Sequence, residues 1–195
     1  MDATPDASPR SFIALTSVKQ MRALAHPLRM QVLGELRVNG PRTAGALAEI
    51  FGEAPGTLSY HLRTLAEFGF VEEAPELAAD RRERWWRSAH EYTEVNPAGP
   101  DASAAERQAS ATIRHQIVDV YAATLHRVID GEDEQPRQWV RASTFDDTVA
   151  FLTADELAEA SAELRAVAEK WHARGDRDRP GTEPAQIIVH AFRRP

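Results

Sequence analysis

The sequence predicts a mainly helical α+β fold in three parts: a group of short helices closed by a strand hairpin, one long helix, and a small α+β unit. Three observations support this. Between residues 17 and 69, short amphipathic stretches alternate with glycine and proline; two strand-like segments follow at 70–74 and 83–89; and an apolar stripe then continues from 103 to about 130. The predicted domains are a disordered tail at 1–11, an N-terminal domain at 12–94, a linker at 95–102 and a C-terminal domain at 103–195.

Composition limits the functions that need to be considered. A chain of 195 residues with 43% hydrophobic content can bury a core, and it contains no cysteine, which excludes disulfides, thiolate metal sites and a cysteine nucleophile. The net charge of −7 argues against a general nucleic-acid binder. The charge is uneven, because residues 10–90 carry eleven Lys and Arg against nine Asp and Glu, whereas residues 91–195 carry twelve against nineteen. Contact with nucleic acid would therefore be local.

Two helices are predicted before residue 40. Residues 17–25 form a short amphipathic helix, and the His26-Pro27 pair ends it because a residue before proline avoids the helical region. Pro27 suits the first turn of the second helix, which continues to about residue 38, where Gly40 stops it.

The next two helices and the turn between them predict a helix-turn-helix. The first spans 43–51 with Thr43 as its N-cap, and residues 52–54 leave room only for a tight turn. The second begins near residue 55, and Leu58, Leu62 and Leu65 form one narrow apolar stripe along it. Its opposite face presents Gly56, Tyr60, Arg63 and Glu67. In this motif the second helix is the one that enters a major groove.

Segments 70–74 and 83–89 are predicted as two strands around a polar loop, forming a wing. Trp85 and Trp86 alternate along the second strand, so one is expected in the core and the other partly exposed. The wing carries Arg81, Arg82, Arg84 and Arg87. Guanidinium groups there could reach phosphates or a minor groove, and the alternative is a solvated hairpin.

Residues 18–89 resemble the winged helix-turn-helix of ArsR-type transcriptional regulators. The resemblance rests on LAHPLRMQVLGEL at 24–36, TAGALAEI at 43–50, TLSYHLRTLAEFGFV at 57–71, and an arginine-rich hairpin ending in RWWRS. It implies a homodimeric, sequence-specific regulator, in the simplest case a repressor, that binds a pseudo-palindromic operator in double-stranded DNA.

The resemblance also implies which residues contact DNA: Thr57, Ser59, Tyr60, Arg63, Arg81, Arg82 and Arg84. Their chemistry agrees, because short hydroxyl side chains bond phosphates or base edges and Arg63 is long enough for bidentate contact with a guanine. Glu67, one turn further on, would repel phosphates, so the first half of the helix is expected to dock. His61 matches a family position too, but it lies beside the leucine stripe and we interpret it as structural.

Members of this family often sense metals, and the sequence departs from both patterns that they use. Where thiolate sensors carry a cysteine pair, this chain has Pro41 and Arg42. His115 and His126 share a face of the predicted long helix with Asp119 nearby, but isoleucines stand at the flanking ligand positions. Since zinc takes about four ligands, no metal or cofactor is predicted, and these three residues are weak candidates set against ordinary helix histidines.

The C-terminal half begins with a long helix. Ser103 and Glu106 form a capping box that opens it, Gly131 ends it, and its long apolar face is expected to be a dimer seam. The α+β unit that follows is predicted to contain strands at 139–144 and 148–152, a helix opened by Thr153 and Glu156, and a strand at 185–192. It resembles the C-terminal extensions of a subgroup of ArsR-like regulators.

This unit has two open interpretations: a dimerisation and packing module, or a small-molecule effector pocket lined by Tyr121, Trp139, Phe151 and Trp171. No phosphate-binding loop, zinc-protease motif or hydrolase motif occurs, so the protein is not expected to be an enzyme. A winged helix used as a protein-interaction module is the alternative for the whole chain. Neither a membrane-length apolar run nor a signal-peptide pattern occurs, so we expect a cytoplasmic protein without membrane contact.

Overall fold

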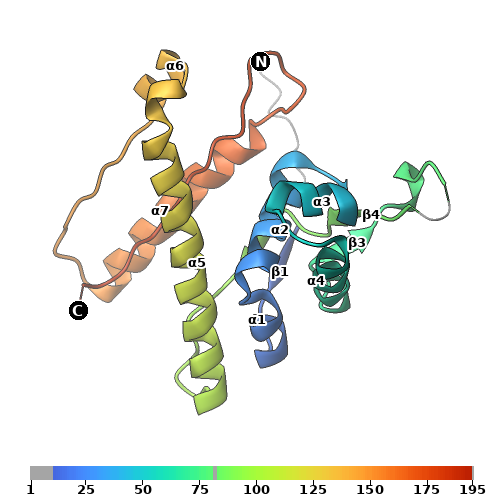
Figure 1. Cartoon of the computed structure of the whole chain (residues 1–195). Helices are drawn as coiled ribbons and strands as arrows, with labels where there is room; N and C mark the ends of the chain where they lie inside the picture. Colours follow the sequence, from blue (N-terminus) through green and yellow to red (C-terminus); the bar gives the residue numbers. More distant parts are fainter. Residues whose placement is uncertain (1–10, 81–82, 195) are drawn as a thin grey trace, which may run out of the picture. The chain divides into compact units, whose positions relative to one another are not determined.

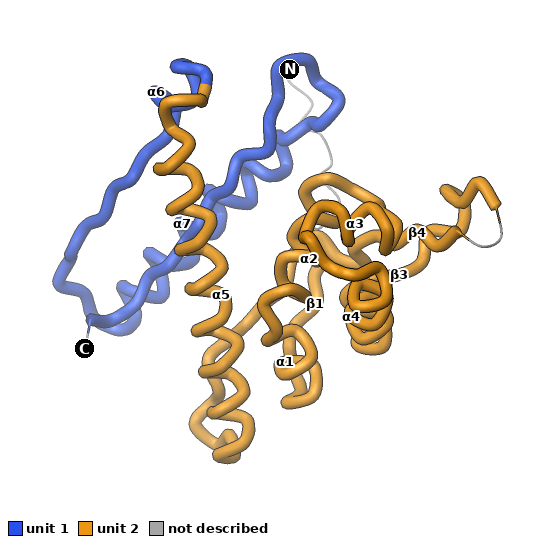
Figure 2. Tube along the Cα trace, viewed as in Figure 1, with its two compact units in different colours: residues 1–8, 136–195 blue, residues 9–135 orange. Residues whose placement is uncertain are grey.

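The computed structural model describes residues 11–80 and 83–194. Contacts divide the described residues into two compact units, which we call the N-terminal unit, ending at Gln135, and the C-terminal unit, starting at Pro136 (Figure 2). Residues 1–10 of the predicted tail at 1–11 lie outside the described residues. Among the residues described, no helix has the length and apolarity needed to cross a membrane.

The N-terminal unit contains five helices among its described residues, together with short strands (Figure 1). The helices are α1 (Val18–Leu24), α2 (Pro27–Asn39), α3 (Ala44–Phe51), α4 (Pro55–Glu67) and α5 (Ala104–Asp130). The strands are β1 (Phe12–Ala14), β2 (Arg42–Thr43), β3 (Val71–Glu73), β4 (Trp85–Ser88) and β5 (Tyr92–Glu94). Two single 3-10 turns, at Pro75–Leu77 and Glu132–Glu134, complete the unit.

The turn between α3 and α4 is built by local sequence signals. Thr43 caps α3 by accepting a hydrogen bond from the Ala46 N–H. Gly52 ends α3 with a φ of 67°, a left-handed conformation that glycine adopts without steric cost. Pro55 then occupies the first turn of α4, where its missing N–H is not needed. The predicted helix-turn-helix is confirmed.

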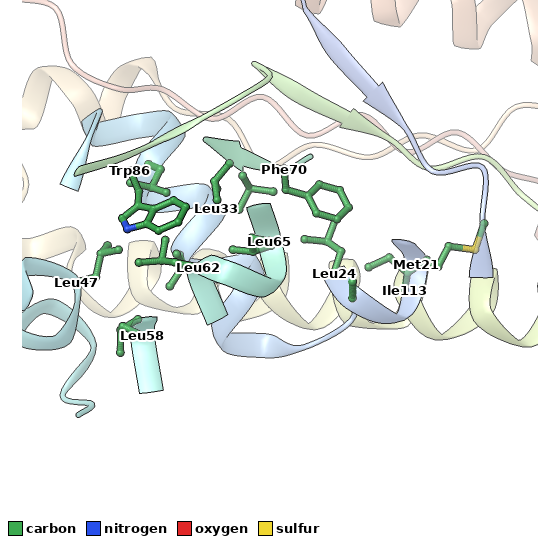
Figure 3. Packing of buried hydrophobic residues seen from close by; sticks show 14 of the residues in the cluster. Met21, Leu24, Leu33, Leu47, Leu58, Leu62, Leu65, Phe70, Trp86 and Ile113 are labelled. Carbon is green, nitrogen blue, oxygen red and sulfur yellow. The ribbon is translucent and has the colours of Figure 1, made fainter. Parts of the chain in front are cut away.

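One core joins all the helices of the N-terminal unit (Figure 3). Leu58, Leu62 and Leu65 of α4 are fully buried, and Leu47 of α3 and Phe70 after α4 are buried beside them. Burying a side chain of this size contributes roughly 1.5–3 kcal/mol. The leucine stripe therefore fixes the orientation of α4 about its own axis.

Two small sheets complete the wing and its base. The two predicted strands form: β3 and β4 pair antiparallel with Val71 opposite Ser88, and β2 adds to the other side of β4. Trp86 is buried and Trp85 is partly exposed, which confirms their predicted alternation. The sequence did not reveal β2, nor the parallel pairing of β1 with β5, because both depend on residues far apart in the chain.

Helix α5 begins with the predicted capping box and packs against α1 and α2. Ile113 is fully buried in the core of the same chain, and Ile117 packs against it. The predicted dimer seam is therefore partly wrong, because its first turns are covered by α1. Beyond Val118 the helix still exposes Leu125, Val128 and Ile129. By contacts, α5 belongs to the N-terminal unit, whereas the predicted boundary placed it with the C-terminal domain.

The C-terminal unit is helical where it is regular. The segment predicted as a strand at 139–144 lies instead in the short helix α6 (Arg137–Ala142), and the strands predicted at 148–152 and 185–192 are not formed. Helix α7 (Ala154–Ala173) starts with the predicted Thr153 and Glu156 capping box. None of its residues is buried, and Leu164 and Trp171, large apolar side chains on this helix, are about half exposed. The prediction of strands failed because each lacks a partner strand within the unit.

Leu62→Ala tests the role of the leucine stripe. Removing this fully buried side chain leaves a cavity beneath α4, and we expect the free energy of unfolding to fall by about 2–5 kcal/mol. Leu77→Ala, at an exposed leucine of the same unit, is the control and should change it by less than about 1 kcal/mol. Chemical denaturation followed by tryptophan fluorescence measures both, and equal losses would contradict the assignment.

Candidate nucleic-acid interface

Helix α4 presents a face opposite its buried leucine stripe. Tyr60 is 62% exposed, and Arg63 and Glu67 are exposed on the same side. None of the ion pairs between described residues involves Arg63, so its guanidinium is available to an external acceptor. We call Thr57, Ser59, Tyr60 and Arg63 the α4 contact face.

The two hydroxyl residues of this face lie in the first half of α4. Thr57 and Ser59 are partly exposed, and the Thr57 N–H belongs to the first turn, where it donates to Ala54 O at 2.9 Å. Since the Thr57 N–H is already bonded, the hydroxyls of these two residues are the groups that could bond phosphate oxygens. The geometry favours docking by the first half of α4, with Glu67 at the far end.

The wing arginines are paired with carboxylates of the neighbouring strand. Arg84 lies 3.4 Å from a Glu73 oxygen, and Arg87 donates to Glu72 at 2.7 Å and also contacts Glu76. The hydrogen bond to Glu72, followed by the charge of Glu76, raises the pKa of Arg87. The predicted contacts Arg81 and Arg82 lie outside the described residues. Both described wing arginines are therefore paired, and residues 71–80 and 83–88 together carry more acidic than basic side chains.

Arg37 holds the base of the wing to α2, a role that the sequence did not reveal. Its guanidinium donates to His90 O at 3.0 Å and to Thr93 Oγ1 at 2.9 Å. His90 lies between β4 and β5 and Thr93 lies on β5, so the Arg37 side chain joins this part of the chain to α2. Spacing gives no signal for it, because its partners are more than fifty residues away.

His61 points away from the α4 contact face. It is only 6% exposed, and its ring centroid lies 4.6 Å from that of His26. Its placement agrees with a structural interpretation, since the side chain lies between α4 and the start of α2.

The weak metal candidates are exposed along α5. His115, Asp119 and His126 are all on the surface, and in the described part of the chain no group of three or more histidine, aspartate or glutamate side chains is close enough to hold a metal ion.

The candidate effector residues are split between the two units. Tyr121 is partly buried on α5, whereas Trp139 and Trp171 belong to the C-terminal unit, on α6 and α7. Phe151 is 101% exposed and so lines no cavity within its own unit. An effector pocket formed by these four residues stays a prediction.

The comparisons with known proteins agree with this architecture. Residues 24–74, which include α2, α3, α4 and β3, match the family described as a helix-turn-helix domain. No curated protein matches the chain.

Two solved structures are similar to the chain. Reduced HlyU from Vibrio cholerae is 17% identical, with 50% of this chain and 84% of that chain covered and a TM-score of 0.31. The transcriptional regulator Tm0710 from Thermotoga maritima is 13% identical, with 78% and 85% covered and a TM-score of 0.30. It is the matched family and the fold itself that make the N-terminal unit a winged helix-turn-helix.

Arg37→Ala tests the tie between α2 and the wing base. Losing the guanidinium leaves the His90 carbonyl and the Thr93 hydroxyl without this donor, and we expect a loss of about 1.5–3 kcal/mol of folding free energy. Arg22→Ala, at an exposed arginine of α1, is the control and should lie within about 0.5 kcal/mol of the parent. Thermal unfolding of both variants measures the difference, and a stable Arg37→Ala protein would refute the tie.

Proposed function

We propose that the protein is a DNA-binding transcriptional regulator that reads a specific sequence by placing α4 in a major groove. The observation that carries this proposal is the division of α4 into two faces. Its leucines are fully buried, while Tyr60 and Arg63 project outward from the second helix of a helix-turn-helix. That is the geometry by which such a helix offers side chains to base edges.

The regulator acts as a homodimer on a pseudo-palindromic operator. Support comes from α5, whose second half exposes Val118, Leu125, Val128 and Ile129 and could pack against a second copy. A twofold dimer places its two α4 helices on half-sites about one helical turn, roughly 34 Å, apart. Binding over a promoter would exclude polymerase, so we propose repression.

Charge limits how the protein holds DNA. The chain carries a net charge of −7, and the described wing arginines are engaged by glutamates. Few phosphates can therefore be neutralised, and base contacts by the α4 contact face must supply a larger share of the affinity. We expect a shallow dependence of affinity on salt, with a slope of about −0.9 for each phosphate contacted.

We include control of DNA binding by a small ligand in the proposal, and we place the binding site for that ligand in the C-terminal half of the chain. A small molecule bound there would relieve repression by favouring a dimer whose α4 spacing no longer suits the operator. We propose no catalytic activity and no cofactor, and we place the protein in the cytoplasm, where its DNA target lies.

A winged helix used for protein interaction is the second candidate. The pairing of both described wing arginines with glutamates favours it, because a wing that holds phosphates usually offers unpaired cations. Selection of bound duplexes from a random pool by the full chain separates the two. A recovered inverted repeat with half-sites about one turn apart supports the regulator. Failure to retain any duplex at low salt supports the interaction module.

Arg63→Ala tests sequence reading by α4. If the guanidinium contacts a guanine, we expect binding to the selected duplex to weaken by about 1–3 kcal/mol, while binding to scrambled DNA changes little. Arg165→Ala, an exposed arginine of α7, is the matched control. Fluorescence anisotropy with both duplexes gives the two affinities, and an equal loss on both would mean that Arg63 contacts only the backbone.

The double variant Glu72→Gln/Glu76→Gln tests whether the pairing of Arg87 with these two glutamates limits its contact with DNA. Removing both carboxylates releases Arg87 for phosphate contact, so we expect tighter binding to every duplex and a salt slope steeper by about 0.9. Glu132→Gln/Glu134→Gln, after α5, changes the net charge by the same amount outside the wing and serves as the control. The same gain in this control would assign the effect to net charge alone.

A further inference from the structure

Two histidines meet beneath the proposed DNA-reading helix, and the proposed function does not use them. His26 stands at the N-cap of α2, and His61 lies on the inner side of α4, with their ring centroids 4.6 Å apart and the rings tilted by 44°. We call these two residues the histidine pair. It joins the corner between α1 and α2 to α4.

The pair has no place for an added proton. The Nδ1 atoms of both rings are buried and have no hydrogen-bond partner among the described residues. A neutral imidazole tolerates this, because one ring nitrogen carries no hydrogen. A cationic imidazole carries N–H donors on both nitrogens, so protonation would leave a buried donor unsatisfied, which disfavours the charged form.

The groups that face the pair also oppose positive charge. Arg29 of α2 lies beside it, held in place because its guanidinium donates to the Ala23 and Arg22 carbonyls at the end of α1. The N-terminus of α2, where His26 is the cap, carries partial positive charge as well. Tyr60 precedes His61 on α4, and Glu53, in the turn before α4, is the acid that favours the charged form of His61.

The pKa values follow from these contacts. Burial, and then the charge of Arg29, lowers the pKa of His26 below its ordinary value. Burial, then His26 and Arg29, lowers that of His61, with Glu53 acting in the opposite direction. In the opened or unfolded protein both rings return to an ordinary pKa near 6.5.

We propose that the histidine pair makes DNA binding sensitive to acid: a proton taken up by either ring separates α4 from the corner of α1 and α2 and withdraws the α4 contact face from its DNA-competent position. The proton is the effector, and the structural response is local. This inference rests on the proposed function, since it describes the regulation of the same helix.

The sign of the effect follows from linkage. Because the closed form binds protons less readily than the opened form, the closed form is fully favoured above pH 6.5 and loses stability as the pH falls below that value. Each histidine can raise the opening equilibrium up to about tenfold per pH unit. Acid normally strengthens DNA binding, because exposed histidines become cationic and attract phosphates. The histidine pair predicts instead that acid weakens DNA binding.

Amide hydrogen exchange of the full chain at pH 7.5 and 5.5, corrected for the intrinsic exchange rate, measures the opening directly. We expect protection in α4 to fall by about ten- to a hundredfold at the lower pH, and protection in α7 to change less. Anisotropy with the selected duplex at constant ionic strength should show a severalfold rise in Kd over the same range. Unchanged α4 protection, or a Kd that falls with acid, would overturn the proposal.

His26→Phe and His61→Phe provide matched variants, since phenylalanine keeps a ring in the contact and cannot take up a proton. Each should lose at least half of the acid response on a logarithmic scale, and His115→Gln, at an exposed histidine of α5, should keep all of it. An undiminished response in both phenylalanine variants refutes the pair as the sensor.

Two further measurements keep the outcomes separate. Where a variant does not fold, NMR titration of the parent decides, since the pKa values of both pair histidines must lie below the ordinary value near 6.5, and ordinary values overturn the inference. If no duplex binds at pH 7.5, the proposed function fails. If a duplex binds at pH 7.5 and the affinity does not fall with acid, the proposed function stands and the acid-sensitive contact alone is refuted.

Discussion

The burial of three leucines along α4 is the constraint on which the rest of the structure depends. Leu58, Leu62 and Leu65 allow the helix a single rotation about its axis, because turning it by a quarter would expose them and cost several kcal/mol. Tyr60 and Arg63 are thereby held on the outward face of α4. The core thus determines which residues can reach a partner, and their chemistry determines which partner they suit.

Electrostatics modifies this arrangement rather than creating it. An acidic chain that binds DNA must keep repulsion low at the contact surface, and pairing of the wing arginines with Glu72, Glu73 and Glu76 reduces long-range attraction as well. Weak attraction to any DNA leaves recognition to short-range contacts made by α4. Below the same helix, burial, and then the charge of Arg29, lowers the pKa of two histidines that pack against it.

The features that could be predicted from sequence are those with local causes. Thr43, Ser103 and Thr153 cap helices through partners three residues away, and Gly52 ends α3 through its own backbone conformation, so spacing alone reveals them. The two faces of α4 follow from helical periodicity in the same way. Other features join residues that are far apart in the chain, and no local sequence pattern predicts them. They are the parallel pairing of β1 with β5, the hydrogen bonds of Arg37 and the histidine pair.

In the C-terminal unit the prediction failed in the opposite way. Local strand preference predicted strands that the described residues of the unit do not form. Residues 148–152 and 185–192 have the composition of strands, yet a strand is stabilised by hydrogen bonds to a neighbour and by a covered face, and both are missing here. Residues 139–144 follow Pro136, and their short helix starts with hydrogen bonds to the carbonyl of that proline. Because α7 buries none of its side chains within the unit, the unit draws little stability from a core of its own. Its order must therefore depend on capping and local hydrogen bonds, which makes it the part of the described chain most responsive to whatever packs against it.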